Sequence, residues 1–413
     1  MLAVLSIANY FLYTLLTILI SRWMGTAVLG YFLFTVSIAN ISLVITSLGK
    51  NKAVLNELTQ LIKAQKSATE KTYIHFHLWA IPAFSLLLCV GALVIFAILD
   101  LRFSIIKSNL LLGICYYTFI MTVTILTCRI LLVYGYKGFS IAIDRIIVPG
   151  ISLTLLTLLF FTYHKINLND LLIIYGISWT ICFFLSLIMY FFKIEKLNKS
   201  IKKKDTQERW LFSGSKYMIA TLLFLIYHNA GIIILIIVFN SAHDAGVYST
   251  LFYIVKVIYI FQIISSAVIA TKLSKIKQFN KLKGMQMAFN KIIAYYKKVA
   301  IAFFLLIAAL GYTILSWYGI PYSNELFIGL LLMVGGNCLF LVYGFGGYVL
   351  QYYDLKKHLY KNYGIMLGLS IIMNLVLIPY LGVLGASIAF FLPMLVMVKL
   401  QSHTIFKNLQ LKL

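Results

Sequence analysis

The feature that most constrains this chain is a series of apolar runs that recurs along nearly the whole sequence, most of them long enough to cross a membrane. Because an α-helix rises about 1.5 Å per residue, about 20 apolar residues cross a hydrocarbon core roughly 30 Å thick. Only 11% of the 413 residues are charged and 62% are hydrophobic, whereas about a quarter of residues are charged in ordinary globular domains. The chain is therefore expected to be an all-α polytopic membrane protein.

The apolar runs predict about twelve transmembrane helices. Their approximate ranges are 2–20, 27–48, 74–99, 109–133, 139–162, 170–192, 217–239, 247–270, 299–318, 325–350, 362–379 and 383–400. Between these runs we expect a basic loop over 49–73, an external turn over 240–246 and a long basic inner segment over 271–298 that continues as helix.

The longest break in the apolar pattern is a basic stretch from Lys193 to Lys216. It divides the chain into halves with six predicted spans each. The predicted domains are an N-terminal six-helix bundle (1–192), a basic cytoplasmic linker (193–216) and a C-terminal six-helix bundle (217–413).

The net charge of +24 follows the membrane topology. Of the 35 Lys and Arg residues, 29 lie in alternate connections and 4 in the intervening ones. Since cytoplasmic loops carry the excess of Lys and Arg, the basic loops, both termini and the linker are predicted to be cytoplasmic. The basic residues are dispersed over short loops and line no single groove, which argues against a nucleic-acid partner.

No constellation typical of an enzyme is present. The sequence has no Walker A motif, no carboxylate pair and no Ser/His/Asp arrangement, and we expect no cofactor. The five cysteines all fall within apolar runs without metal-ligand spacing, so we expect neither a metal site nor a disulfide. They are Cys89, Cys115, Cys128, Cys182 and Cys338.

Lys256 is the most informative polar residue at membrane depth. A charge at the centre of a span costs about 2.5 to 3.5 kcal/mol on insertion scales, so such residues usually face a wet cavity. Tyr253 and Tyr259 flank Lys256 at i−3 and i+3, which on a helix is the same face. We interpret the three residues as substrate-binding, with the lysine holding an anionic group. The alternative is a structural lysine paired with a backbone carbonyl.

A second polar group lies within one or two turns of the predicted cytoplasmic face. Arg129, Asp144 and Arg145 are candidates for an anion-binding entrance. The alternative is that the arginines snorkel and that Asp144 pairs with one of them across helices. Asp144 and Arg145 are adjacent and cannot face each other on one helix.

Three further polar residues are candidates for ion coupling. His228 lies in the middle of the seventh span and can titrate near neutral pH. Asn229, next to it, and Asn374, in the eleventh span, complete the set. The alternatives are a hydrogen-bonded structural histidine and, for Asn374, an interhelical hydrogen bond.

The two halves share a weak sequence echo. Residues 26–31 read TAVLGY and enter the second span, and residues 244–248 read DAGVY and enter the eighth. Second and eighth spans are equivalent if the halves repeat, as in many alternating-access carriers.

Three motifs resemble the polysaccharide (O-antigen type) flippases of the multidrug/oligosaccharidyl-lipid/polysaccharide (MOP) exporter superfamily. The first runs from Arg22 to Tyr31 and is similar to the family's R-x-x-G…G-x turn. The second, AGVYS at 245–249, is similar to its A-G-x-Y-S entry to span eight. The third, from Asn374 to Ala386, resembles its N-x-x-L-I-P-x-x-G-x-x-G-A motif. Within the first motif, Arg22 is a further substrate-binding candidate.

The resemblance implies a MOP/MATE-like fold of two six-helix bundles around a cationic cavity. It implies a flippase in the bacterial inner membrane that carries undecaprenyl-diphosphate-linked oligosaccharide units from the cytoplasmic to the outer leaflet by alternating access. The partners would be this lipid-linked substrate, membrane lipids, and the polysaccharide polymerase with its chain-length regulator. Many members carry an acidic residue with a basic neighbour in span seven, whereas this chain has YHNA at 227–230.

Two other functions compete with the flippase. A drug or metabolite antiporter of the same superfamily would favour a titratable carboxylate in its cavity and few cations. A polymerase or another membrane enzyme of polysaccharide assembly would need an extended external segment, and the predicted external loops are all short.

Overall fold

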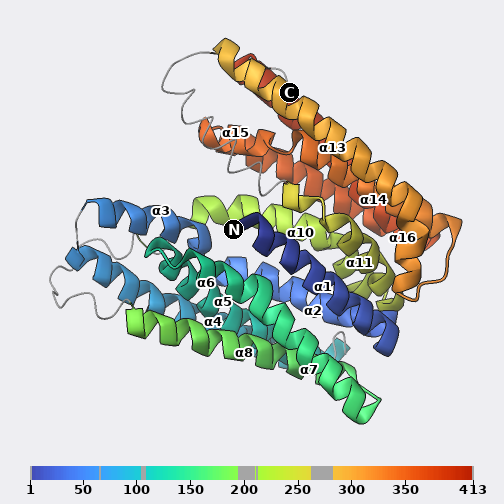
Figure 1. Cartoon of the computed structure of the whole chain (residues 1–413), viewed down its shortest axis with the longest axis horizontal. Coiled ribbons are helices and arrows are strands. Elements are labelled where there is room, and N and C mark those ends of the chain that lie inside the picture. The colour runs from blue at the N-terminus through green and yellow to red at the C-terminus, as the bar shows by residue number, and fades with distance from the viewer. Residues whose placement is uncertain are drawn as a thin grey trace. The chain divides into compact units, whose positions relative to one another are not determined.

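The computed structural model describes residues 2–64, 67–103, 108–193, 210, 213–261 and 282–411 (Figure 1). All regular elements in these ranges are helices, as the sequence predicts. Ten described helices are long and apolar enough to cross a membrane. Most of the basic linker predicted at 193–216 and residues 271–281 of the long basic inner segment lie outside the described residues.

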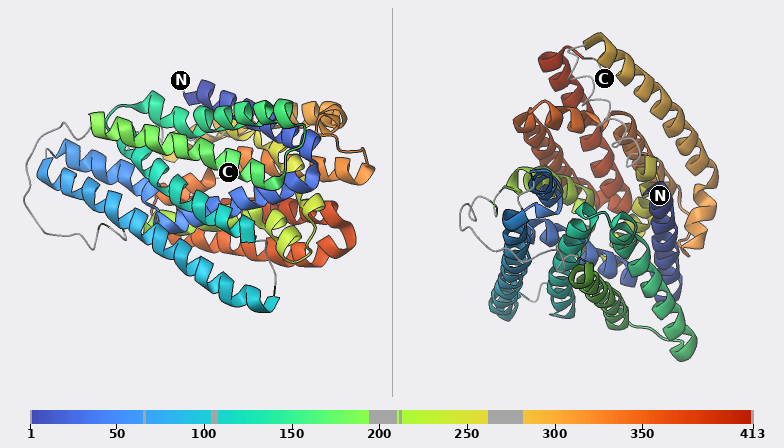
Figure 2. Two further views of the ribbon diagram at one scale, coloured as in Figure 1. Left: turned by 90° about the horizontal axis from the view of Figure 1, so that it is seen from below. Right: turned by 60° about the vertical axis from the view of Figure 1, so that its left-hand side comes forward.

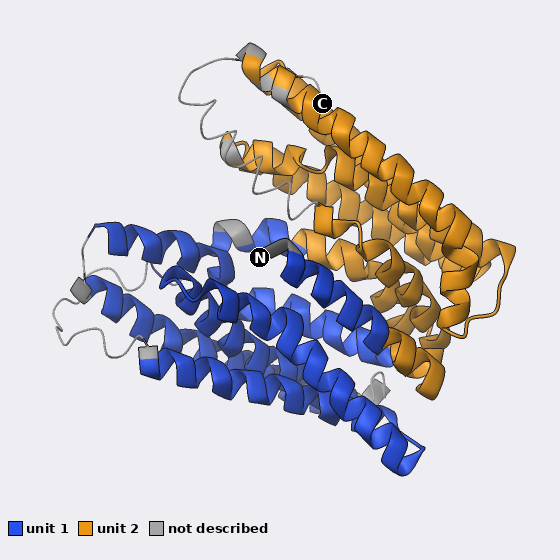
Figure 3. Ribbon diagram, in the orientation of Figure 1, with its two compact units in different colours: residues 1–16, 31–222 blue, residues 17–30, 223–413 orange. Residues whose placement is uncertain are grey.

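Packing divides the chain into two compact units (Figure 3). Unit 1 comprises residues 1–16 and 31–222, and unit 2 comprises residues 17–30 and 223–413. The outer part of the first hairpin, residues 17–30, therefore packs with the C-terminal half, and residues 213–222 pack with the N-terminal half. The division of the sequence into two six-span bundles and a linker stays a prediction.

Unit 1 is organised around α5. Its helices are α1 (Leu2–Met24, in part), α2 (Thr26–Thr46, in part), α3 (Lys50–Lys63), α4 (Ser67–Phe103), α5 (Ser108–Val133), α6 (Lys137–Ala142), η1 (Ile143–Ile147), α7 (Val148–Tyr163) and α8 (Leu168–Lys193). The central helix α5 packs against α3, α4 and α8. Figure 2 shows the long helices running alongside one another. One expectation is corrected here: α3 and the start of α4 occupy most of the predicted loop 49–73.

The fifth predicted span is a helix that contains one π-helical turn. The segments α6, η1 and α7 run without a break from Lys137 to Tyr163, and η1 is a π-helical turn. Pro149 is the second residue after this turn. Because proline has no N–H to donate to the carbonyl four residues earlier, a wide turn before it accommodates the missing bond.

Unit 2 contains the C-terminal spans. Its helices are α10 (Ser215–Ile237, in part), α11 (Ala242–Lys256), α13 (Leu282–Trp317), α14 (Asn324–Tyr343), α15 (Gly346–Tyr352) and α16 (Lys356–Leu409). Helix α14 packs against α13, α11 and α16. The predicted turn 240–246 is wrong over most of its length, because α11 begins at Ala242. Ser241 caps it, its hydroxyl accepting from the N–H of Asp244.

The eleventh and twelfth spans are the two halves of α16. Gly382 divides them with φ 51° and ψ −127°, a conformation that side chains with a Cβ rarely adopt. This glycine belongs to the motif that carries the resemblance to polysaccharide flippases. The motif thus encodes the reversal between two spans.

The two echoing stretches pack against each other within unit 2. A Cβ atom on Gly30 would overlap the carbonyl oxygen of Ala242, and one on Gly246 would overlap that of Thr26. The contact is reciprocal, because residues 26 and 30 of α2 face residues 246 and 242 of α11. Only residues without a Cβ allow the two backbones this approach.

Candidate functional site

Lys256 ends α11 and lies against two aromatic rings. Its Nζ atom is 4.6 Å from the centre of the Tyr253 ring and 5.3 Å from that of Phe252. Both distances are in the range of cation–π contacts. The side chain is half-buried, and in the described part of the chain no carboxylate lies within 4.0 Å of it. The structure thus gives Lys256 aromatic neighbours in place of a counterion.

Tyr259 follows Lys256 in the chain and contacts His228. The regular helix ends at Lys256, and short turns follow, in which Ile258 and Ile260 donate to carbonyls three residues earlier. The Tyr259 hydroxyl lies 2.7 Å from His228 Nε2. The interpretation of Tyr253 and Tyr259 as substrate-binding residues beside Lys256 stays a prediction.

His228 is buried and has hydrogen-bond partners on both ring nitrogens. Nδ1 lies 2.9 Å from the carbonyl oxygen of Phe224, which can only accept, so Nδ1 carries a proton. In the neutral ring Nε2 then accepts from the hydroxyl of Tyr259. Aromatic rings surround the imidazole, with centres 4.0 Å away for Phe224 and 5.7 Å for Phe390. This is the geometry of a well-satisfied structural histidine, and its coupling role stays a prediction.

The two asparagine candidates bond to their own helices. Asn229 donates to the carbonyl of Leu225 at 2.8 Å, and Asn374 donates to that of Ser370 at 2.7 Å. Asn374 is buried, and its amide oxygen has no hydrogen-bond partner among the described residues. Neither contact supplies an ion site, so coupling through these residues stays a prediction.

Unit 1 holds a polar cavity of about 240 Å³ that we call the arginine cavity. Arg129 of α5, Ser140 of α6, and Asp144 and Arg145 of η1 contribute its polar lining. Arg145 donates to the hydroxyl of Ser6 in α1. The structure thus brings together the three residues that the sequence grouped as an anion-binding entrance.

Asp144 does not neutralise either arginine by direct contact. Within the described residues, no ion pair of 4.0 Å or less joins Asp144 to Arg129 or Arg145. The sequence-based alternative, a direct pair between Asp144 and an arginine, is not formed. Arg145 donates to Ser6, and both arginines line the cavity.

Arg22 lies apart from both groups and is exposed. Its Nε donates to the carbonyl of Trp317 at 2.8 Å and its Nη2 to that of Ser316 at 3.1 Å. These carbonyls end α13, where a cation also interacts favourably with the helix dipole. The contacts indicate a capping role, and substrate binding by Arg22 stays a prediction.

The sequence of this chain matches no known family, whereas its structure matches solved structures. No protein-family model matches it, and no curated protein matches its sequence. Solved structures match over nearly its whole length. The MATE multidrug transporter DinF-BH superposes with a TM-score of 0.69 at 14% identity, over 98% of this chain and 94% of the transporter. The chain has the fold of MATE transporters.

The lipid II flippase MurJ shares this fold. Its inward closed conformation superposes with a TM-score of 0.67 at 14% identity, over 98% of this chain and 87% of MurJ. An inward-facing MATE family transporter of the MOP superfamily gives 0.63 at 14% identity, over 95% of this chain and 92% of that one. The predicted MOP/MATE-like fold class is thereby confirmed, whereas the polysaccharide flippase subfamily stays a prediction.

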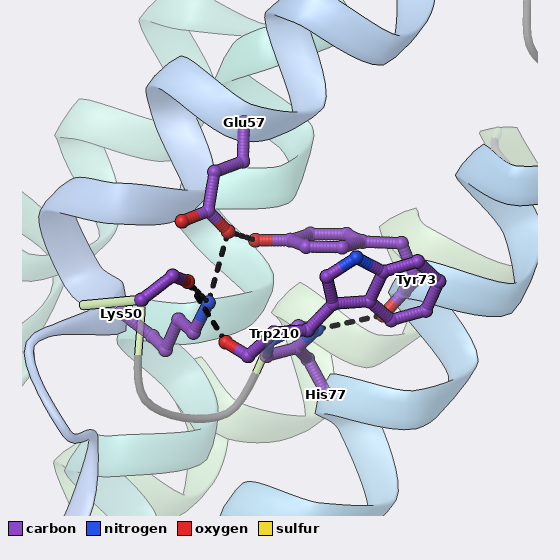
Figure 4. A network of polar contacts seen from close by, with 6 residues as sticks. Lys50, Glu57, Tyr73, His77 and Trp210 are labelled. Carbon is purple, nitrogen blue, oxygen red and sulfur yellow. Dashed lines mark hydrogen bonds and ion pairs between the residues drawn. The ribbon is translucent and has the colours of Figure 1, made fainter. Parts of the chain in front are cut away.

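Sequence reasoning missed one buried network in this MATE-like chain. Lys50 is fully buried, and its Nζ contacts Glu57 Oε2 at 2.9 Å and donates to the Ser213 hydroxyl at 2.6 Å. Tyr73 donates to the same carboxylate oxygen at 2.6 Å (Figure 4). We call Lys50, Glu57, Tyr73 and Ser213 the Lys50 network. It joins α3 and α4 to the residues that lead into α10.

The pKa values of the ion pair follow from its surroundings. Burial lowers the pKa of Lys50, and the bond to Glu57 opposes this only in part. Burial raises the pKa of Glu57, but hydrogen bonds from Ser213, Tyr73 and Lys50, with the lysine's charge, outweigh it and lower that pKa. A signal existed in the sequence: Glu57 is one of only 11 acidic residues and lies two helical turns from Lys50.

Proposed function

We propose that this protein is a flippase that moves undecaprenyl-diphosphate-linked oligosaccharide units from the cytoplasmic to the outer leaflet of the bacterial inner membrane, for O-antigen, capsule or exopolysaccharide assembly. The observation that carries the proposal is Lys256, a membrane-depth cation with aromatic neighbours and no carboxylate within 4.0 Å in the described residues. Such a cation is suited to an anionic headgroup.

A carrier built of two units suits a substrate that has a polar headgroup and an apolar tail. Sugar hydroxyls without partners are costly in hydrocarbon, whereas the prenyl chain has no reason to leave it. A cavity open to lipid would admit the headgroup while the tail stays outside, and rocking of two bundles would expose it to the other face. The diphosphate leaves a negative-inside cell, so each elementary charge gains about 2.3 kcal/mol per 100 mV.

Two comparisons bear on the class of substrate. MurJ, which shares the fold, is named as a lipid II flippase, and a lipid-linked diphosphate is the corresponding substrate class here. MATE structures share the fold equally well and are named as multidrug transporters. A cationic drug would require unshielded acid in the cavity, and Asp144 shares its cavity with two arginines. We therefore favour the lipid-linked substrate, and expect no chemical catalysis.

The test is a leaflet assay in the native host. The gene is deleted while the glycosyltransferases remain, and the lipid-linked unit is located with a membrane-impermeant lectin or label. Complementation uses the wild type, Lys256→Ala and Lys256→Arg, with Lys165→Ala, which changes an exposed lysine, as the matched control. We expect accumulation on the cytoplasmic side, rescue by the wild type and Lys165→Ala, and failure of Lys256→Ala at normal protein levels.

Other results would refute the proposal. If the unit reaches the outer leaflet without this protein and no second flippase is present, the flippase function is wrong. If sensitivity to cationic drugs changes on deletion while the leaflet distribution does not, the antiporter takes its place. Accumulation of unpolymerised units on the outer face would indicate a polymerase.

A further inference from the structure

The arginine cavity contains polar atoms that the described protein leaves without partners. The Nε of Arg129 and the hydroxyl of Ser140 are both buried with no hydrogen-bond partner. Ser140 is 5% exposed. A buried donor or acceptor without a partner carries its full desolvation cost, so such atoms usually contact a ligand or water.

Ser140 differs from the buried threonines of the adjacent helix α5. Thr118, Thr122, Thr124 and Thr127 of the adjacent helix α5 all donate to the carbonyl four residues earlier. Ser140 makes no such bond, although its own N–H bonds to the carbonyl of Tyr136. Its hydroxyl therefore remains available at the wall of the cavity.

The cavity is larger than a site for one water. A water molecule's share of liquid volume is about 30 Å³, and the cavity volume is about 240 Å³. Several waters or a small polyatomic ligand would fit. Ile125, Cys128 and Leu132 supply apolar wall, which strengthens electrostatic contacts inside.

Positive charge exceeds negative charge at this site. Arg129 and Arg145 face one acid, Asp144, in the cavity. Lys52 of α3 does not line the cavity, and its Nζ donates to the Thr221 hydroxyl at 3.0 Å. Burial lowers the pKa of Lys52 and the charge of Arg129 lowers it further, so the two cations lie close enough to repel. An anion beside Arg129 would relieve this repulsion.

We propose that the arginine cavity binds the phosphoryl oxygens of a diphosphate. Arg129 and Ser140 would contact the ligand, since a guanidinium presents a planar fork of donors that matches phosphate oxygens. Arg145, which already donates to Ser6, would add charge, and Asp144 would balance one guanidinium. The two arginines outnumber the one acid in the lining, which favours an anionic ligand. The inference does not depend on transport, and Lys256 lies in the other unit.

The binding test uses the full chain in phosphatidylcholine nanodiscs. Inorganic diphosphate is titrated calorimetrically in one arm, and undecaprenyl diphosphate is compared with undecaprenyl alcohol in the other. Variants are Arg129→Gln, Arg129→Lys and Ser140→Ala, with Lys165→Gln, which changes an exposed lysine, as the control. We expect diphosphate affinity to fall about tenfold or more in Arg129→Gln and severalfold in Ser140→Ala, with partial retention in Arg129→Lys and no change in Lys165→Gln.

Ser140→Ala separates a ligand contact from a structural role. The hydroxyl has no protein partner among the described residues, so its removal should leave the thermal unfolding of the ligand-free protein unchanged while weakening diphosphate binding. Binding of free diphosphate would indicate a soluble ligand, and binding of only the lipid form would indicate a headgroup. Absence of binding in both arms, or affinity that is unaffected by Arg129→Gln and Ser140→Ala, would overturn the proposal. Normal binding together with a failed leaflet assay would refute only the flippase function.

Discussion

Removing the acid of the Lys50 network should destabilise the protein strongly. In Glu57→Gln the ammonium of Lys50, which is 0% exposed, loses the carboxylate at 2.9 Å and retains the Ser213 hydroxyl at 2.6 Å. Breaking a buried pair in this way costs about 3–5 kcal/mol, because it leaves an uncompensated charge. Glu57 itself is 27% exposed, so water reaches one side of the pair and we expect a loss near about 3 kcal/mol.

The double variant makes the reasoning refutable. Lys50→Met with Glu57→Gln removes both charges, keeps an acceptor for Tyr73, and should recover most of the loss, since apolar replacement of a buried pair is often neutral. The matched control is Asp354→Asn, which breaks an ion pair of the same 2.9 Å length whose side chains are 32% and 85% exposed. Exposed pairs are worth about 0–1 kcal/mol. Unfolding in detergent is followed by tryptophan fluorescence, and equal losses for Glu57→Gln and Asp354→Asn would refute the argument.

The Lys50 network also predicts how the stability of the protein changes with pH. The folded-state pKa of Glu57 is lowered, so its stabilising contribution is fully present above the unfolded value of about 4.3. It is lost as the pH falls through the folded value. The pKa of Lys50 is also lowered, so the folded state binds fewer protons and stability rises with pH on the alkaline side. The unfolding free energy of the double variant should therefore depend less steeply on pH in both the acidic and the alkaline range.

Three further predictions concern contacts of unit 2. Gly246→Ala forces a Cβ into the carbonyl of Thr26 and should cost about 1–3 kcal/mol of unfolding free energy. Gly364→Ala, which meets no atom within 4 Å, should cost far less, and equal losses would contradict the close packing. Tyr259→Phe removes the donor to His228 Nε2 and should cost about 1–3 kcal/mol, measured by thermal unfolding. Arg22→Ala should lower stability by about 1 kcal/mol or less and spare transport; a transport loss at normal stability would instead support Arg22 as a substrate contact.

Much of the fold was predictable because each membrane span requires a continuous run of apolar residues, which can be read directly from the sequence. Hydropathy located the spans, and the glycine of the third motif marked the reversal at Gly382. Helix boundaries were less predictable. Helix α11 begins at Ala242, inside a predicted turn, because Ser241 caps it, and α3 forms within a stretch whose lysines suggested a loop. The first error arose because a short polar residue such as Ser241 serves helix ends as well as turns, and the second because lysines are compatible with an exposed helix as well as a loop.

The sequence alone determined that the chain crosses the membrane many times, that Lys256 is costly at its depth, and that Arg129, Asp144 and Arg145 lie near one face. Only the tertiary structure decided which of these residues meet. It placed the two arginines and Asp144 in one cavity, turned Tyr259 toward His228, and buried Lys50 against Glu57. The physical reason is that a span apolar on all faces carries no periodic signal of the face that turns inward. Such partners are selected by helix packing, which brings together residues far apart in the chain.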